Sequence, residues 1–257
     1  MRTQFVDSSQ LVLADFLRPE IATELESLIR AEDALLESGR RTSVVAGRTT
    51  NLIPPQTSGT ATPWTLVGPP HIQRFVALPF SLSASSPRLV TLLASINTLF
   101  SSPAFRTFIA TLTSLLPTSY TTQVRRFRPG LDYTLARGEP SDSEARLDVG
   151  LGLTPVPATE ADVRLWEGGE VGGWEVWLAG EEGGDEATYG AEQEEEPLLA
   201  LEPGWNRLNV VLRDAGVVRF VKYLSARAPA SRWDVGGEWE VVGVEESEDE
   251  VEGGEAQ

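Results

Sequence analysis

The sequence contains no cysteine, one histidine and one lysine, and these shortages exclude whole classes of chemistry. Without cysteine the chain has no thiol nucleophile, no disulfide, and no zinc or iron–sulfur site built on sulfur ligands. Because His71 is its only imidazole, it contains neither a two-histidine, one-carboxylate iron site nor an HExxH zinc site. The sequence therefore predicts no metal ligands and no catalytic residues in this chain.

Apolar runs long enough to cross a membrane are also missing. No stretch reaches the roughly 18–20 apolar residues that a spanning helix needs. The first three residues lead into no signal-peptide core. We therefore expect a soluble, intracellular protein, located in the cytoplasm, the nucleus or both, with no membrane partner.

Basic residues are scarce, with 21 against 38 acidic ones, and the formal charge is −17. Residues 181–196 hold eight acids and residues 245–255 hold seven, with no base in either run. The rest of the chain is nearly neutral, which excludes a nucleic-acid partner, because such binding needs a clustered positive field. We interpret the two runs as an acidic disordered insertion and an acidic tail, which either act as solvated linkers or bind a basic partner.

The first 120 residues contain mainly helical patterns, in which apolar residues recur with a period of 3.6. A proline suits a first helical turn because its missing N–H has no partner there. The predicted elements are a strand at Ser9–Leu13, a helix with Pro19 in its first turn that ends at Gly39, a loop over 40–63, a strand at Ile72–Leu78, and helices over Pro87–Phe100 and from Ser102-Pro103 to Pro117.

From Tyr120 onward the pattern changes to short strands between turns. About eight antiparallel strands after a helical lead-in predict a mainly β fold with supporting helices, a double-stranded β-helix (jelly roll, cupin-like) that lacks an iron site. We expect one domain formed by residues 1–180 and 197–244, interrupted by the insertion 181–196 and followed by the tail 245–257. The predicted strands are Tyr120–Arg128, Tyr133–Ala136, Arg146–Leu153, Trp174–Leu178, Leu198–Leu201, Asn206–Arg213, Val217–Ser225 and Trp233–Val241, with a hairpin turn at Asp214–Gly216.

Several short runs resemble a known family. Together they are similar to the C-terminal domain of the oxoglutarate- and iron-dependent prolyl hydroxylases that modify a small-subunit ribosomal protein, a portion named the C-terminal degradation domain in fungi. The runs are Gly68-Pro69-Pro70-His71, Arg126-Phe127-Arg128-Pro129-Gly130-Leu131-Asp132-Tyr133-Thr134-Leu135-Ala136, Pro203-Gly204-Trp205-Asn206, Val211-Leu212-Arg213-Asp214, Phe220-Val221-Lys222-Tyr223-Leu224-Ser225 and Arg232-Trp233-Asp234.

The resemblance implies a two-domain enzyme in which both halves are double-stranded β-helices and only the N-terminal half holds iron and oxoglutarate. The present chain resembles the second half, so Fe(II), oxoglutarate and ascorbate are implied for a catalytic N-terminal domain outside it. A rough alignment by strand order puts Ala136 and Gly138 where the HxD pair of the catalytic half would be, and Phe220 near the distal histidine. None of the three can ligate a metal.

Three arginines are candidate contact residues. Arg232 lies near the place where the resemblance puts the arginine that pairs with the cosubstrate carboxylate. Its alternative interpretation is a structural or partner-facing arginine, paired with Asp234 or stacked near Trp233. Arg126 and Arg128 share one face of a strand, and that face is either a strip that binds an anion or an acidic peptide, or a solvated surface.

Two further features have a functional and a structural interpretation. His71 is an acid, a base or a ligand, or else a loop or core-edge histidine. Six tryptophans gather in the β half and either line a peptide groove or fill the core of the sandwich. They are Trp166, Trp174, Trp177, Trp205, Trp233 and Trp239.

Two functions agree with these observations. The first is a non-catalytic regulatory domain that binds a protein partner; by resemblance, such domains promote turnover of a transcription factor in an oxygen response. The second is one part of an active prolyl 3,4-dihydroxylase that acts on a ribosomal protein and affects translation termination. The expected partners are the catalytic domain and a ribosomal protein, a transcription factor or an inhibitor protein.

Overall fold

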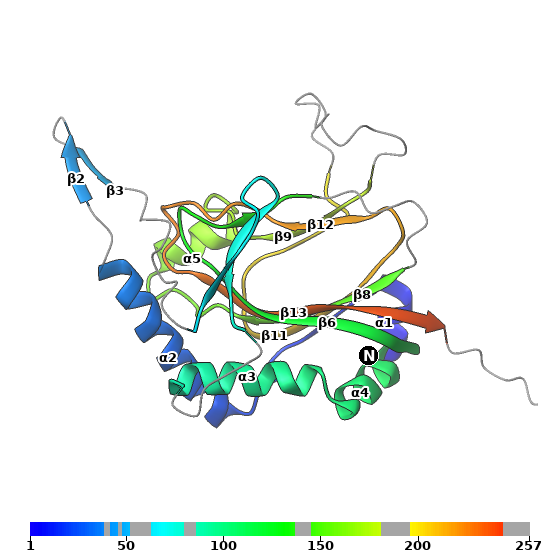
Figure 1. The fold of residues 1–257 in the computed structure, drawn as a ribbon. Helices are drawn as coiled ribbons and strands as arrows, with labels where there is room; N and C mark the ends of the chain where they lie inside the picture. The colour runs from blue at the N-terminus through cyan, green and yellow to red at the C-terminus, as the bar shows by residue number, and fades with distance from the viewer. Residues whose placement is uncertain are drawn as a thin grey trace, which may run out of the picture.

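A computed structural model describes residues 1–38, 42–45, 48–51, 63–79, 86–136, 145–180 and 196–243. Within these residues the main feature is an eight-stranded antiparallel sheet in the order β1-β11-β8-β13-β6-β5-β4, with β7 paired to β5 (Figure 1). Its strands are β1 (Gln10–Leu13), β4 (Thr65–Val67), β5 (Gln73–Ala77), β6 (Leu115–Phe127), β7 (Tyr133–Thr134), β8 (Arg146–Leu153), β11 (Trp205–Arg213) and β13 (Arg232–Gly243).

A smaller antiparallel sheet faces the large one. It has the order β10-β9-β12, and Figure 1 shows β9 and β12 above β13, β6 and β11. The two facing sheets form a double-stranded β-helix, so the predicted fold class is confirmed. The strands of the small sheet are β9 (Glu175–Leu178), β10 (Leu199–Leu201) and β12 (Val218–Val221), and a separate hairpin contains β2 (Thr42–Val45) and β3 (Arg48–Asn51).

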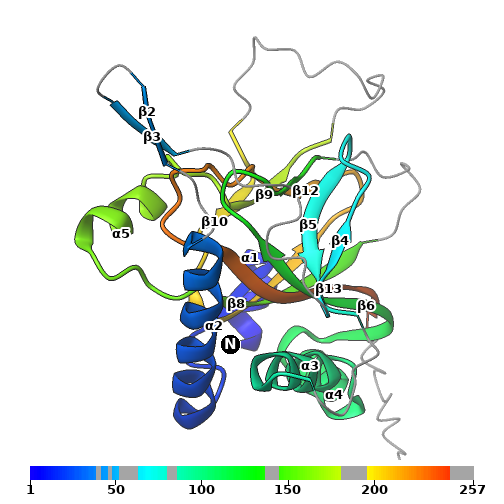
Figure 2. The same ribbon diagram turned by 60° about the vertical axis from the view of Figure 1, so that its left-hand side comes forward.

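Helices cover the outer face of the large sheet. Figure 2 shows α2 (Pro19–Ser38) and the pair α3 (Arg88–Phe100) and α4 (Pro103–Thr113) below it. The Ser102 hydroxyl caps α4 by accepting a hydrogen bond from Phe105 N–H at 3.2 Å. Two shorter helices are α1 (Arg2–Ser8) and α5 (Glu160–Glu167). No helix in the described ranges combines the length and the apolar character that a membrane crossing demands.

Side chains alternate along each strand of the large sheet, so that one set faces the helices and the other set faces the small sheet. On β8, Leu147, Val149 and Leu151 are fully buried in the apolar core against the helices. Asp148, between them in sequence, points to the opposite face and accepts a hydrogen bond from Trp177 on β9. The largest apolar cluster therefore lies between the large sheet and the helices, while the space between the two sheets also receives charged side chains.

The structure corrects several predicted boundaries. The second helix of the pair ends at Thr113, not at Pro117, because Ser114 adopts a left-handed conformation with φ of 61° and terminates it. The residues after it begin β6, and its pairing with β13 shifts register between Glu240 and Val241, opposite Pro117, a position where a strand tolerates proline. Part of the predicted loop 40–63 forms the hairpin β2–β3.

Besides the hairpin β2–β3, three elements were not predicted. They are α1, α5 and β4. A sequence signal was present for α5, because the Thr159 hydroxyl caps the helix by accepting from Asp162 N–H, three residues later. The predicted acidic insertion 181–196 and acidic tail 245–257 lie outside the described residues, apart from Glu196. The strands β11 and β13, which follow the insertion in sequence, pair with β8, which precedes it.

The predicted hairpin turn joins β11 and β12. Gly216 has a φ of +79°, and Val217 N–H donates to the Asp214 carbonyl at 3.2 Å. No described atom lies within 4 Å of the place where a Cβ would stand at Gly216, so only the backbone conformation disfavours a side chain. We expect Gly216→Ala to lower the free energy of unfolding by about 1 kcal/mol in urea denaturation.

Gly243→Ala is the matched control for that prediction. This glycine also has open space around its Cβ position, but its φ is not positive. We expect its free energy of unfolding to change by less than about 0.5 kcal/mol. Equal effects of the two substitutions would contradict the backbone explanation.

Candidate functional site in the interior of the roll

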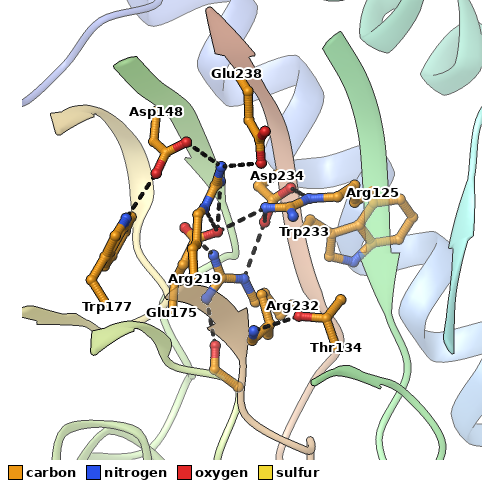
Figure 3. A network of polar contacts seen from close by, with 12 residues as sticks. Arg125, Thr134, Asp148, Glu175, Trp177, Arg219, Arg232, Trp233, Asp234 and Glu238 are labelled. Atoms are coloured by element: carbon orange, nitrogen blue, oxygen red, sulfur yellow. Dashed lines mark hydrogen bonds and ion pairs between the residues drawn. The ribbon is translucent and has the colours of Figure 1, made fainter. Parts of the chain in front are cut away.

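Charged side chains gather between the two sheets, and Figure 3 shows them pointing toward one another. They share an inward-facing strand position and an exposed side-chain fraction of 14% or less. This interior network consists of Arg125 on β6, Asp148 on β8, Glu175 on β9, Arg213 on β11, Arg219 on β12, and Arg232 and Asp234 on β13.

Glu175 is the centre of the interior network. Its carboxylate accepts hydrogen bonds from Arg219 Nη2 at 2.8 Å, Arg232 Nη2 at 3.0 Å and Arg125 Nη2 at 3.1 Å. Burial by itself would raise the pKa of Glu175, but the positive charges of these three guanidinium groups outweigh it and hold that pKa well below its usual range. The carboxylate is therefore ionised although it is buried.

Asp148 anchors the other end of the interior network. Its carboxylate accepts from Arg213 Nε at 2.9 Å, Arg219 Nη1 at 3.0 Å and Trp177 Nε1 at 2.8 Å. Burial disfavours a charged Arg219, but its carboxylate neighbours, Asp148 first among them, raise the pKa of this guanidinium above its ordinary value. Glu238, whose side chain is 39% exposed, lies 3.2 Å from Arg213 at the edge of the network.

The ionisation of Glu175 makes stability depend on pH. A carboxylate whose pKa is lower in the folded state stabilises the fold above its unfolded pKa, near 4.5, and loses that contribution as the pH falls further. We therefore expect the free energy of unfolding at pH 7 to be higher for the wild type than for Glu175→Gln. The difference is expected to shrink steadily below pH 4.5 in urea titrations. A difference that stays constant down to pH 3 would contradict this assignment.

Arg232 is paired inside the protein. Its Nε donates to Asp234 at 3.1 Å, its Nη2 to Glu175 at 3.0 Å and its Nη1 to the Gly173 carbonyl at 2.5 Å. Each nitrogen of this guanidinium therefore has a protein acceptor. The predicted pairing with Asp234 is present. The Trp233 ring instead lies under the Arg126 guanidinium, and the Arg232 guanidinium lies 5.9 Å from the centre of the Phe127 ring.

Arg126 and Arg128 do not form a solvated strand face, and that interpretation is wrong. Their exposed fractions are 1% and 0%. Arg126 donates to Asp33 at 2.9 Å and lies over the Trp233 ring, while the guanidinium of Arg128 donates two hydrogen bonds to the Asp132 side chain, at 2.7 and 2.9 Å. Strand alternation does separate them from Phe127, but internal acids occupy both guanidinium groups, so neither presents a surface strip to an acidic peptide.

The tryptophans mostly fill the core. Trp166, Trp177, Trp233 and Trp239 are at most 4% exposed, as the core-packing interpretation expects. Trp174 and Trp205 are partly exposed, and Trp174 lines a surface cavity. His71 is exposed on the turn that precedes β5 and has no place in the interior network, in agreement with a loop histidine.

Sequence reasoning missed most of the interior network. Of its members, only Arg232 and its candidate partner Asp234 were singled out from the sequence, and Glu175 was not. A signal was available, because these residues alternate with apolar ones in strands that are otherwise buried, as in Glu175-Val176-Trp177. That alternation identifies inward-facing charges, although it does not identify their partners.

A family model and a curated relative match this chain. The family model described as "Oxoglutarate and iron-dependent oxygenase degradation C-term" matches residues 1–249. The chain is 30% identical over 245 residues to a protein of Ostreococcus tauri named prolyl 3,4-dihydroxylase OGFOD1. The alignment covers 91% of this chain and 43% of that protein, so the chain spans less than half the length of this relative.

Two solved structures are similar at low identity. One is a prolyl hydroxylase from Trichoplax adhaerens in complex with a hypoxia inducible factor oxygen degradation domain peptide, with 13% identity and a TM-score of 0.48 over 92% of this chain and 86% of that one. The other is a prolyl-4-hydroxylase from Pseudomonas putida, with 13% identity and a TM-score of 0.44 over 93% of this chain and 95% of that one.

The iron and oxoglutarate in the description of the family do not fit the residues inside this roll. Among the described residues, no group of three or more His, Cys, Asp or Glu side chains is arranged to hold a metal ion. Of the positions aligned with iron ligands, Ala136 follows β7 and Phe220 lies on β12, while Gly138 lies outside the described residues. The interior carboxylates already pair with the interior arginines, so they offer no vacant ligand set.

Proposed function

Because this chain belongs to the family of C-terminal degradation domains of oxoglutarate- and iron-dependent oxygenases, we propose that it is a non-catalytic domain that binds a protein partner. The observation that carries the proposal is the interior network, in which Glu175 pairs with three arginines in the space between the sheets. A cosubstrate carboxylate would have to displace this internal carboxylate from guanidinium groups that it already neutralises.

The sequence supports the same conclusion independently. One imidazole and no thiol leave the chain without the two histidines that an iron site of this class requires. Iron, oxoglutarate and ascorbate therefore act in a catalytic domain outside these 257 residues, which is consistent with a relative more than twice as long. This domain then contributes by binding a partner, a transcription factor or its inhibitor protein, and promotes its turnover in response to oxygen, in the cytoplasm or nucleus.

The name of the Ostreococcus relative favours a second candidate function. In it, the chain is the non-metal half of an active prolyl 3,4-dihydroxylase that acts on a ribosomal protein and affects translation termination. Removing this half from the full-length protein distinguishes the two functions. Retained prolyl hydroxylation with a longer partner lifetime supports the regulatory function, whereas loss of hydroxylation supports the second candidate.

A binding measurement on the isolated chain tests the absence of a cosubstrate site. We expect titration calorimetry with oxoglutarate, with and without Fe(II), to give no saturable heat, because Arg232 is fully engaged by Glu175, Asp234 and Gly173. Saturable oxoglutarate binding that Arg232→Ala abolishes would overturn the proposal. Iron-dependent oxygen consumption with turnover of a prolyl peptide would do the same.

A further inference from the structure

Arg74 on β5 is a buried arginine whose hydrogen-bonding groups are not all satisfied. Its exposed fraction is 9%, and its Nε and Nη2 nitrogens are buried with no hydrogen-bond partner among the described residues. A buried charge is costly unless hydrogen bonds and an opposite charge compensate it. Two unused donors on one buried guanidinium group therefore indicate a missing acceptor at this place.

The carboxylate that forms an ion pair with Arg74 is already occupied by another arginine. Asp132, which is fully buried, lies 3.7 Å from Arg74 Nε, too far for a hydrogen bond. The same carboxylate accepts from Arg128 Nε at 2.7 Å and from Arg128 Nη2 at 2.9 Å. These three buried side chains therefore carry a net positive charge. Arg128 binds both oxygens of one oxyanion through the guanidinium edge that is unused in Arg74.

Two tyrosines lie beside Arg74 near the surface. Arg74 and Tyr133 stand directly opposite each other in the ladder of β5 and β7, so their side chains point to the same face. The centre of the Tyr133 ring lies 6.3 Å from that of the Tyr223 ring, and Tyr223 is 48% exposed. The Tyr133 hydroxyl donates to the Pro70 carbonyl, whereas the Tyr223 hydroxyl forms no hydrogen bond with any described residue.

The Tyr223 hydroxyl is protonated at neutral pH and can therefore donate a hydrogen bond. Partial burial raises the pKa of Tyr223 above its ordinary value of 10.0, and the positive charge of Arg74 opposes this rise only in part. The electrostatic effect of Arg74 on this hydroxyl agrees with their position on one face. Two donors of Arg74 and one of Tyr223 thus lie together near the surface without an acceptor in the described part of the chain.

We propose that Arg74 and Tyr223 bind a phosphate group. The Nε and Nη2 edge of Arg74 supplies two parallel donors for two of its oxygens. A carboxylate has only those two oxygens, whereas a phosphate group has a third one that accepts from the Tyr223 hydroxyl. The group belongs either to a free phosphorylated compound or to a phosphorylated side chain of a protein. This site shares no residue with the interior network, so the inference goes beyond the proposed function and is tested separately from it.

The test follows the Arg74 Nε–H signal by NMR in the full chain carrying isotope-labelled arginine; this signal is the one missing from Arg74→Met. We expect sodium phosphate at pH 7 to shift it saturably, whereas sodium chloride of equal ionic strength does not. Sodium acetate is expected to bind roughly fivefold more weakly, the effect of one hydrogen bond. Tyr223→Phe is expected to weaken phosphate binding by a similar factor and to leave acetate binding unchanged.

A phosphoserine residue with blocked termini distinguishes the two sources of phosphate. If it binds at least as tightly as inorganic phosphate, the site takes a phosphorylated protein side chain. Weaker binding than that of inorganic phosphate assigns the site to a free phosphorylated compound.

Melting temperatures separate this site from a structural ion pair. Methionine replaces the unsatisfied charge of Arg74 with an apolar chain of similar length, so without phosphate Arg74→Met is expected to melt no lower than wild type. Phosphate is expected to raise the melting temperature of wild type more than that of Arg74→Met. Arg88→Met is the matched control, because Arg88 is exposed on α3 and its loss is expected to leave the phosphate shift of the Arg74 signal unchanged.

Three results would overturn the inference. The first is a phosphate shift of the Arg74 signal no larger than that of chloride. The second is equal binding of acetate and phosphate. The third is an Arg74→Met variant that melts more than about 4 °C below wild type, which would make Arg74 a structural partner of Asp132. None of them affects the proposed function, which the cosubstrate measurements above test.

Discussion

Replacing Glu175 by glutamine is expected to destabilise the protein by about 3 kcal/mol, because removing one member of a buried ionic group leaves its partners uncompensated. Glutamine keeps the shape of the side chain but not the charge that Arg125, Arg219 and Arg232 share. For a chain of this length the loss corresponds to a melting temperature roughly 6–12 °C lower. Circular dichroism during heating and urea titration measures both quantities.

Glu240→Gln is the control for this experiment. Glu240 lies on a strand of the large sheet, β13, but its side chain is exposed and hydrogen-bonds only to the Ser119 hydroxyl among the contacts of the described residues. We expect a change within about 0.5 kcal/mol. If the two variants unfold at the same urea concentration, the interior network does not hold the sheets together.

The second large effect is expected at Asp33, which joins α2 to the large sheet. This side chain is 7% exposed and accepts hydrogen bonds from Arg126 at 2.9 Å, the Trp233 indole at 3.2 Å and Ser231 N–H at 3.2 Å. Asp33→Ala leaves these three donors without that acceptor, so we expect a loss of about 3 kcal/mol. Urea denaturation followed by far-ultraviolet circular dichroism gives the value.

Two further variants show how much of the expected loss at Asp33 comes from its charge and how much from its hydrogen bonds. Asp33→Asn keeps a hydrogen-bond acceptor without the charge, so we expect it to lower the free energy of unfolding less than Asp33→Ala does. Glu26→Gln removes one exposed ion pair of the same helix, with Arg30, and is expected to cost less than about 1 kcal/mol. An Asp33→Ala variant as stable as Glu26→Gln would show that α2 is held by its apolar contacts alone.

The two buried ionic groups, around Asp33 and around Glu175, lie on opposite faces of the large sheet. Arg126 and Asp33 tie the helical layer to the outer face, while Arg125 and Glu175 tie the small sheet to the inner face. Arg125 and Arg126 are neighbours in sequence, and strand alternation sends them to opposite sides.

The sequence predicted the local elements well where the pattern was strong. Most strands of the second half and the three longest helices were predicted within a few residues, because periods of 2 and 3.6 depend only on near neighbours. The end of α4 and the short elements α1, α5, β2, β3 and β4 were missed, because a left-handed cap at Ser114 and elements of three to eight residues leave little periodic signal.

By itself the sequence determined that one histidine and no cysteine stand in 257 residues, and hence that an iron site of the oxygenase type cannot form from this chain. It also determined which residues share a face of each strand. Only the tertiary structure decided that Arg125, Glu175 and Arg232 meet, since they come from three strands far apart in sequence. Local pattern specifies the face of a strand, whereas the neighbour of that strand follows from the packing of the whole sheet.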